Sequence, residues 1–197
     1  MRTIISILFI TMIAFTGISY AQDSPKVVVE KYLKAVRNNN YEEAYSYIAK
    51  TDTTIIDWLE LIKYVRKIAP PKLTKVIDLA HNATKQEIVS TSVGGNTAKV
   101  KILSVVPDME ETLRITQDTE DIKSLLDRGG LPKKERLGEC TLVVEDDLWK
   151  ISKVSGVSSG QAAEIAADFA ELILGKDEAE RISKKISESG KKLEEGA

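Results

Sequence analysis

Four aromatic residues and one acid are the side chains in this sequence best suited to chemistry at a shared site. Tyr32, Tyr45, Trp58 and Trp149 are predicted to face the interior of one domain. Their rings either pack in the core or line a cavity, where they would grip an apolar ligand while the phenols hold its polar end. Asp57 stands next to Trp58, and burial beside that indole would raise its pKa and make it a general base. Helical spacing sets Asp57 apart from the main apolar line, so the catalytic interpretation is the minor one.

The other reactive side chains predict no catalytic set. His81 is the only histidine, and we expect it in solvent at the end of a strand. One histidine without clustered acids or cysteines predicts no transition-metal site, no cofactor and no Ser-His-Asp triad. Cys140 is the only cysteine, which excludes an internal disulfide. Its strand-like setting predicts a buried thiol, with intermolecular pairing or a reactive thiol as alternatives. A protein that is not an enzyme is therefore favoured, and no residue is assigned a catalytic role.

Residues 1–21 predict a secretory signal peptide. Arg2 precedes an apolar run over residues 4–18, and residues 19–21 form a small-x-small cleavage site. Cleavage near Ala21 would place the protein in the periplasm or outside a bacterial cell, and retention as an uncleaved anchor is the alternative. No later apolar run reaches the roughly 18 residues that a membrane span needs, so we expect no stable span after cleavage.

The charge balance argues against nucleic acid as a partner. The 197-residue chain carries 28 Lys and Arg against 30 Asp and Glu, a formal net charge of −2. The basic residues are not clustered, whereas nucleic-acid binding depends on concentrated positive charge.

The elements that must position these side chains change from helices to strands along the chain. Ser24 and Pro25 predict the start of an amphipathic helix, which ends at an asparagine turn over residues 38–40 before a short helix over residues 41–48. A third helix, from about Thr54 to Pro70, is apolar on more than one face and is therefore expected to be sandwiched. Alternation then predicts strands over residues 73–79, 87–93, 97–106, 137–144 and 148–154.

Two stretches fall outside this simple order. Residues 109–136 are predicted to be an insertion, in which Leu113 and Ile115 extend a strand and residues 119–128 form a short helix. Residues 156–160 mark a boundary, after which apolar residues at helical spacing predict a helix over residues 162–173 and a thinner one beyond it. That C-terminal helix either folds back on the domain or binds a partner.

Two stretches carry a family resemblance: VVEKYLKAVRNNNYEEAYSYI from Val28, and Leu148-Trp149-Lys150-Ile151 after an acidic turn. Over residues 24–154 the chain resembles the nuclear transport factor 2-like (cystatin-like α+β) superfamily, in particular its small exported bacterial branch of unknown function. The resemblance implies an α+β fold, with N-terminal helices packed on a curved antiparallel sheet around a conical cavity. The expected organisation is a signal peptide (1–21), an α+β domain (22–155) and a helical C-terminal extension (156–197).

The function expected from these observations is binding. We expect an exported, non-catalytic accessory or binding protein of the cell envelope, which holds an apolar small molecule or a protein partner at Tyr32, Tyr45, Trp58 and Trp149. Look-alike folds often dimerise through the open sheet face, so a homodimer is a further expectation. The alternatives are an isomerase- or cyclase-like enzyme that acts in the cone, and an interaction protein that works through the C-terminal helix.

Overall fold

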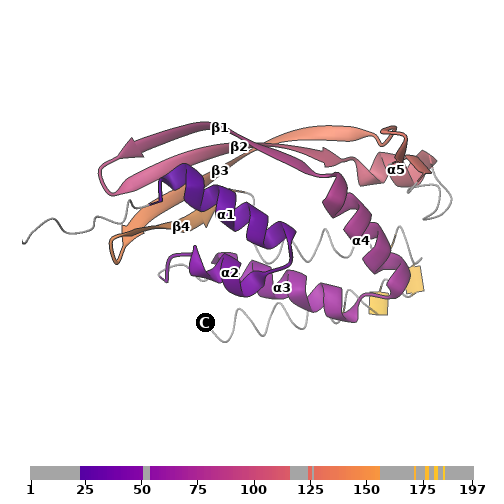
Figure 1. Ribbon diagram of the computed structural model, residues 1–197. Helices are drawn as coiled ribbons and strands as arrows, with labels where there is room; N and C mark the ends of the chain where they lie inside the picture. Colours follow the sequence, from indigo (N-terminus) through magenta and orange to yellow (C-terminus); the bar gives the residue numbers. More distant parts are fainter. Residues whose placement is uncertain are drawn as a thin grey trace, which may run out of the picture.

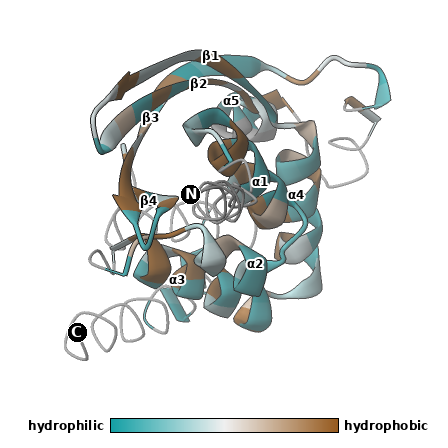
Figure 2. Cartoon of the chain, turned by 60° about the vertical axis from the view of Figure 1, so that its left-hand side comes forward, coloured by the Kyte–Doolittle hydropathy of each residue, from teal (hydrophilic) through white to brown (hydrophobic). Residues whose placement is uncertain are grey.

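A computed structural model of the full chain describes residues 23–50, 54–115, 124–125 and 127–155, together with residues 171, 176–177, 180–181 and 184. These residues form an α+β fold in which one antiparallel sheet is covered by helices on its concave side (Figures 1 and 2). The predicted signal peptide, most of the predicted helix over residues 119–128 and most of the predicted C-terminal helices lie outside the described residues, so the three-part organisation stays a prediction. Within the described part of the chain, no helix is long and apolar enough to cross a membrane.

Helices α1 (Pro25–Arg37) and α2 (Tyr41–Ser46) start where the sequence predicts, although α2 ends two residues before its predicted end at residue 48. The backbone N–H of Val27 donates to Ser24 Oγ at 3.4 Å, and Pro25 occupies the first turn, where a missing N–H removes no helical hydrogen bond. Asn39 turns the chain with φ 55°, a left-handed conformation that asparagine tolerates well. The start of α1 and the turn between the two helices are therefore determined by residues that are close in sequence.

Helix α3 (Thr54–Ile68) is buried on two faces, as its apolar pattern predicts. Ile55 and Leu59 belong to the main hydrophobic cluster, whereas Leu61 and Val65 are buried outside it. Residues four apart lie on one face of a helix, so these two pairs point in different directions. The helix is sandwiched.

The predicted strand over residues 73–79 is wrong, because this segment is helix α4 (Pro71–Ala83). Pro70 precedes the helix in an extended conformation and Pro71 takes its first position, which favours helix initiation. Leu73 and Val76 are 1% and 0% exposed, and their three-residue spacing suits one helix face. The apparent alternation of apolar residues was a coincidence inside a helix.

The sheet is a simple meander whose strands follow one another in sequence, in the order β1-β2-β3-β4. All three pairings are antiparallel. The strands are β1 (Lys85–Gly94), β2 (Thr97–Pro107), β3 (Lys133–Glu145) and β4 (Leu148–Val154). Both predicted hairpins are thus confirmed, although β3 begins four residues before its predicted start.

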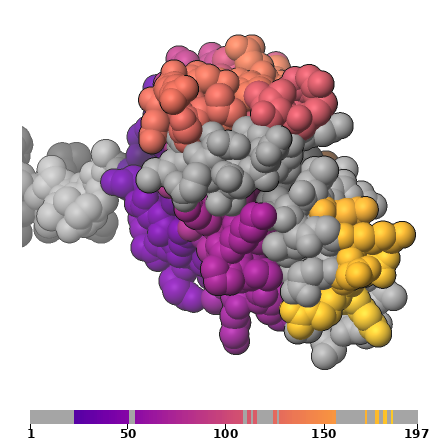
Figure 3. All heavy atoms as spheres, turned by 90° about the vertical axis from the view of Figure 1, so that its right-hand side faces the viewer, coloured from indigo at the N-terminus to yellow at the C-terminus, as the bar shows by residue number. Residues whose placement is uncertain are grey.

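A short helix, α5 (Met109–Ile115), replaces the strand extension that Leu113 and Ile115 were expected to form. Asp108 accounts for the difference: its Oδ1 accepts a hydrogen bond from the backbone N–H of Glu111 at 3.3 Å. An aspartate that bonds a backbone N–H three residues later promotes helix initiation. Figure 3 shows this end of the molecule, with α5 above the helical layer.

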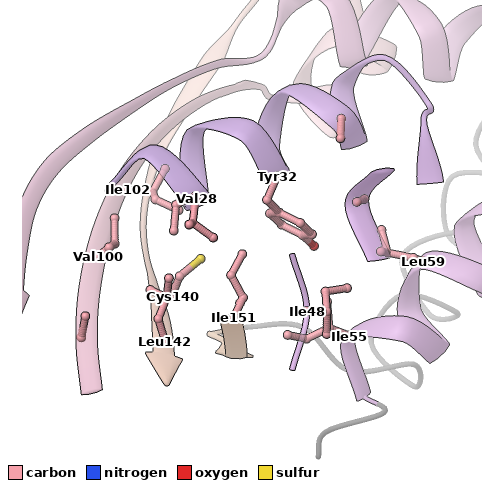
Figure 4. Close-up of a cluster of buried hydrophobic side chains, with 14 residues drawn as sticks. Val28, Tyr32, Ile48, Ile55, Leu59, Val100, Ile102, Cys140, Leu142 and Ile151 are labelled. Atoms are coloured by element: carbon pink, nitrogen blue, oxygen red, sulfur yellow. The ribbon is translucent and has the colours of Figure 1, made fainter. Parts of the chain in front are cut away.

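The main core fills the space between the first three helices and strands β2, β3 and β4 (Figure 4). Helix α1 packs against β2 and β4. Burial of these aliphatic side chains contributes roughly 25 cal/mol for each Å² removed from water. The labelled members are Val28, Tyr32, Ile48, Ile55, Leu59, Val100, Ile102, Cys140, Leu142 and Ile151.

The segment after α2 closes the outer edge of β4. Ile48 and Ile151 form a parallel bridge. The backbone N–H of Ile151 donates to the carbonyl of Tyr47 at 2.8 Å, and that of Ala49 donates to the carbonyl of Ile151 at 2.9 Å. These bonds give β4 a partner on the side that faces away from β3.

Candidate functional site

The four aromatic residues predicted as a ligand site all join the main cluster, at different depths. Tyr32 is 4% exposed, and burial raises the pKa of its phenol. Tyr45, Trp58 and Trp149 are half-buried and pack against the cluster from its periphery. The structure therefore brings all four together around packed side chains, and their role in holding a ligand stays a prediction.

Tyr45 takes part in a phenol–carboxylate contact between two helices, whereas a second such contact, from Tyr47 to Glu43, lies within one turn of chain. Its hydroxyl donates a hydrogen bond to Glu60 Oε1, and Lys63 Nζ lies 3.4 Å from the same oxygen. Burial, followed by the bond to Glu60, raises the pKa of Tyr45. The Glu60 side chain is 38% exposed and paired with a cation, whereas a catalytic acid or base of raised pKa needs a carboxyl sheltered from water. The pair joins α2 to α3 and does not form a catalytic dyad.

His81 lies in the last turn of α4 and not at the end of a strand, so its predicted setting is wrong. Its Nε2 is 2.8 Å from the backbone carbonyl oxygen of Arg37. A carbonyl oxygen can only accept, so Nε2 is assigned the proton in this contact. The ring ties the end of α4 to the end of α1, which is a structural role.

Cys140 is fully buried on β3, which confirms its predicted place in the core. Burial, with a smaller contribution from Glu139, raises the pKa of its thiol to about 12. A thiol must ionise before it becomes a good nucleophile. This cysteine therefore acts as a small apolar side chain.

Asp57 is half-buried in the first turn of α3 and is held by an interaction there. No group of three or more His, Cys, Asp and Glu side chains suited to a metal ion occurs in the described part of the chain. The described residues thus offer neither a metal site nor a sheltered acid–base pair.

An open groove with a volume of about 530 Å³ runs along α4, and we call it the α4 groove. Arg66 Nη1 on α3 binds Asp78 Oδ1 on α4 at 2.7 Å, and this ion pair holds the two helices together beside the groove. Thr74 donates its hydroxyl to the carbonyl of Pro70 at 3.2 Å, which fixes the turn at one end. The groove mixes apolar and polar side chains: Ala69, Pro71, Thr74, Lys75, Asp78, Leu79 and Asn82.

A second groove, of about 360 Å³, lies between α1 and β1. Arg37 Nη2 crosses it to donate to Gln86 Oε1 at 3.4 Å. Leu33 and Ile88 supply its apolar surface, and charged residues from both elements surround them. Its charges are of both signs, which suits water or a mixed protein surface better than a purely apolar ligand.

None of the four predicted aromatic residues lines either groove. Sequence reasoning missed the α4 groove because it assigned the segment after Pro71 to a strand. The available signal was the Pro70-Pro71 pair followed by Leu73 and Val76 at helical spacing. The α1–β1 groove carried no local signal, because its two sides are about 50 residues apart in sequence.

Comparison with known proteins places the chain in no family. No family model matches it, and no curated protein does. Among solved structures, a SEC-C motif containing protein from Rhodopseudomonas palustris gives a TM-score of 0.37 at 10% identity, over 68% of this chain and 80% of that one. A phospholipid-binding protein from Ralstonia solanacearum, solved with a phospholipid, gives a TM-score of 0.29 at 12% identity, over 85% and 95%. Likeness at this level carries no argument about function.

Proposed function

We propose that this protein is an exported, non-catalytic accessory protein of the cell envelope that binds a segment of a partner protein in the α4 groove. The observation that carries the proposal is the contrast between a filled interior and an open groove. The space between α1 and the sheet is packed with aliphatic side chains and Tyr32. A ligand is therefore expected to bind on the surface of the described part of the molecule and not between α1 and the sheet.

The lining of the α4 groove suits a polypeptide. Small-molecule sites bury most of their ligand in a concave, mainly apolar pocket, whereas this groove is open and its lining mixes apolar with polar side chains. Ala69, Pro71 and Leu79 offer contacts to an apolar side chain, and the Asn82 amide offers a donor and an acceptor to a backbone. Lys75 adds a positive charge to the lining, whereas the Asp78 carboxylate is already paired with Arg66.

Membership of the nuclear transport factor 2-like superfamily and export are parts of this proposal. The superfamily is supported by the order of elements, with helices first and a meander that ends in a Leu-Trp-Lys-Ile strand. Export is supported by the basic, apolar and small-residue pattern of residues 1–21. An isomerase- or cyclase-like activity has no support from the Tyr45–Glu60 pair, because the Glu60 side chain is 38% exposed and paired with Lys63.

Native mass spectrometry of the protein recovered from the exported fraction tests the class of ligand. We expect a mass that starts at Gln22 and carries no small molecule. A retained apolar molecule in stoichiometric amount would contradict the protein-partner proposal and restore the small-molecule alternative. A mass that keeps residues 1–21 would contradict signal-peptide cleavage.

Site-specific photocrosslinking in cells tests the groove. A benzophenone amino acid replaces Leu79 in the groove, and in a matched control it replaces Leu148, which is 49% exposed on the final hairpin. We expect a discrete protein adduct from position 79 and none from position 148. Leu79→Glu should weaken binding of that protein by at least about tenfold, as loss of a central apolar contact does. Equal adducts from both positions, or none, would overturn the proposal.

A further inference from the structure

The outer edge of β1 is an open strand edge. In the order β1-β2-β3-β4, strand β1 pairs with β2 alone, and no other described strand lies beside it. Its last six residues, from Val89 to Gly94, are all exposed. The backbone N–H and C=O groups along such an edge can pair with an additional strand.

This edge lacks most of the devices that protect edge strands. Natural edges carry charged side chains, prolines or bulges that prevent pairing. The segment from Ile88 to Gly94 has neither a charge nor a proline, and its one protective feature is a bulge between Ile88 and Ser90. Val89 and Val93 are 48% and 58% exposed. Two exposed β-branched side chains on an uncharged edge mark a surface for strand addition.

The order of residues on the edge is self-complementary. The segment reads Val-Ser-Thr-Ser-Val from Val89 to Val93, and it is identical in both directions. In an antiparallel pair of two such strands centred on Thr91, each Val89 lies opposite Val93 of the second copy. Thr91 then faces its own equivalent, and serine faces serine. Pairs of β-branched residues and threonine pairs are favourable cross-strand neighbours.

We propose that two copies of this chain associate through their β1 edges, with a two-fold axis at Thr91, and join their sheets into one. A two-fold contact uses the same patch on both molecules, so a self-complementary strand suits it directly. Like charges do not meet in this register, since the segment from Ile88 to Gly94 carries no charged residue. The dimer does not depend on partner binding at the α4 groove.

The faces of the strand agree with this arrangement. Thr91 pairs with Val100 and Val93 pairs with Ala98 on β2, and Val100 and Ala98 are buried against the helices. Directly opposed residues point to the same face of a sheet, so Thr91 and Val93 point to the helical side. A two-fold axis perpendicular to the sheet keeps that side common to both copies. Val93 of each molecule would then add an apolar side chain on this face of the junction, whereas Val89 lies in the bulge and has no partner on β2.

Disulfide trapping of the processed full-length protein tests the register. Cys140 is buried, so an introduced cysteine is the accessible thiol. Thr91→Cys places two cysteines directly opposite one another, and we expect a rapid disulfide dimer on mild oxidation. In Ser92→Cys, the matched control, the same thiols are offset diagonally by about 7–8 Å, which disfavours a bridge.

A mixture of Ser90→Cys and Ser92→Cys proteins provides a second test of the same register. Directly opposite positions alternate between hydrogen-bonded and non-hydrogen-bonded pairs. Thr91 with Thr91 and Ser90 with Ser92 therefore sample both geometries, and at least one suits a disulfide. We expect the mixed Ser90→Cys/Ser92→Cys dimer to exceed either homodimer. Disulfide yields that do not depend on position would overturn the proposal.

Sedimentation of the unmodified protein tests association itself. A strand-pair contact lies at the small end of interface sizes, so we expect reversible dimers at about 100 µM. Val93→Lys should abolish them, because two lysines would enter the junction, whereas Leu148→Lys at a remote exposed site should leave them unchanged. A wild-type protein that stays monomeric at this concentration, or dimers that survive Val93→Lys, would refute the proposal.

Discussion

The two edge strands of the sheet, β1 and β4, differ in whether another part of the chain pairs with their outer side. At β4 the chain supplies its own cover: Tyr47 and Ala49 bond Ile151 through their backbones, and Lys150 Nζ donates to the carbonyl of Ser46 at 2.5 Å. At β1 the corresponding edge is exposed and uncharged from Val89 onward. The difference indicates that one edge serves the fold, while the other is available for a further strand.

The largest expected effect comes from damage to the covered edge. Ile151 is fully buried, and Ile151→Ala should lower the free energy of unfolding by about 2–5 kcal/mol, the usual loss for deletion of a buried aliphatic side chain. Val93→Ala at the open edge should stay within about 0.5 kcal/mol in dilute, monomeric protein. Urea denaturation of both variants measures this contrast. Equal losses would show that the two edges do not differ in this way.

A second expected effect concerns ionisation of the buried Cys140 thiol on β3. Burial raises the pKa of Cys140 to about 12, from the ordinary value of 9.0 for an exposed thiol. Because the folded state disfavours the thiolate, the contribution of the neutral thiol is complete below pH 9 and is lost as the pH rises toward 12. Over that window the free energy of unfolding should fall by about 1.4 kcal/mol per pH unit from this group.

Denaturation of wild type and Cys140→Ala at several pH values measures the cysteine contribution as a difference. Other groups titrate in the same range, but they titrate in both proteins, so their effect cancels in the difference between wild type and variant. Identical pH dependence in the two proteins would contradict the burial of the thiol. Wild type should also react slowly with a thiol reagent at pH 8, because labelling requires opening of the core.

A smaller effect is expected at the turn that follows the open edge strand. Gly95 connects β1 to β2 with φ 59°, a conformation that is unfavourable for a residue with a Cβ by about 1–2 kcal/mol. No atom lies within 4 Å of an added Cβ, so Gly95→Ala should cost about 1 kcal/mol from backbone strain alone. A thermal melt measures it, with Gly94→Ala as control, since Gly94 is not at positive φ. Equal melting temperatures for the two variants would contradict this.

Local chemistry made much of the fold predictable. Ser24, Pro25 and the asparagine turn determine the first two helices, and the alternating residues around Gly95 and Asp146 determine two hairpins. The errors lie where two periods compete. After Pro71 the apolar residues fit both a strand and a helix. The proline in the first turn and the burial of Leu73 and Val76 on one face favour the helix.

The candidate surfaces were harder to predict than the elements. The α4 groove depends on contact between Arg66 and Asp78 across two helices, and the open edge of β1 depends on the strand order of the whole sheet. Both are long-range properties that no short sequence window contains. The aromatic residues illustrate the opposite case: their burial was predictable from type and spacing, whereas the absence of Tyr45 and Trp58 from either groove was not.

The parallel bridge between Ile48 and Ile151 has a consequence for folding kinetics. The bond from Lys150 to Ser46 closes a loop of 104 residues, and contacts of such sequence separation slow the folding of a domain. Helices α1 and α2 can form early, but they have no completed sheet to pack against until the last strand exists. A nascent chain that ends before β4 would leave its apolar helix faces exposed. Such a protein reaches its native state only after synthesis of the domain is complete.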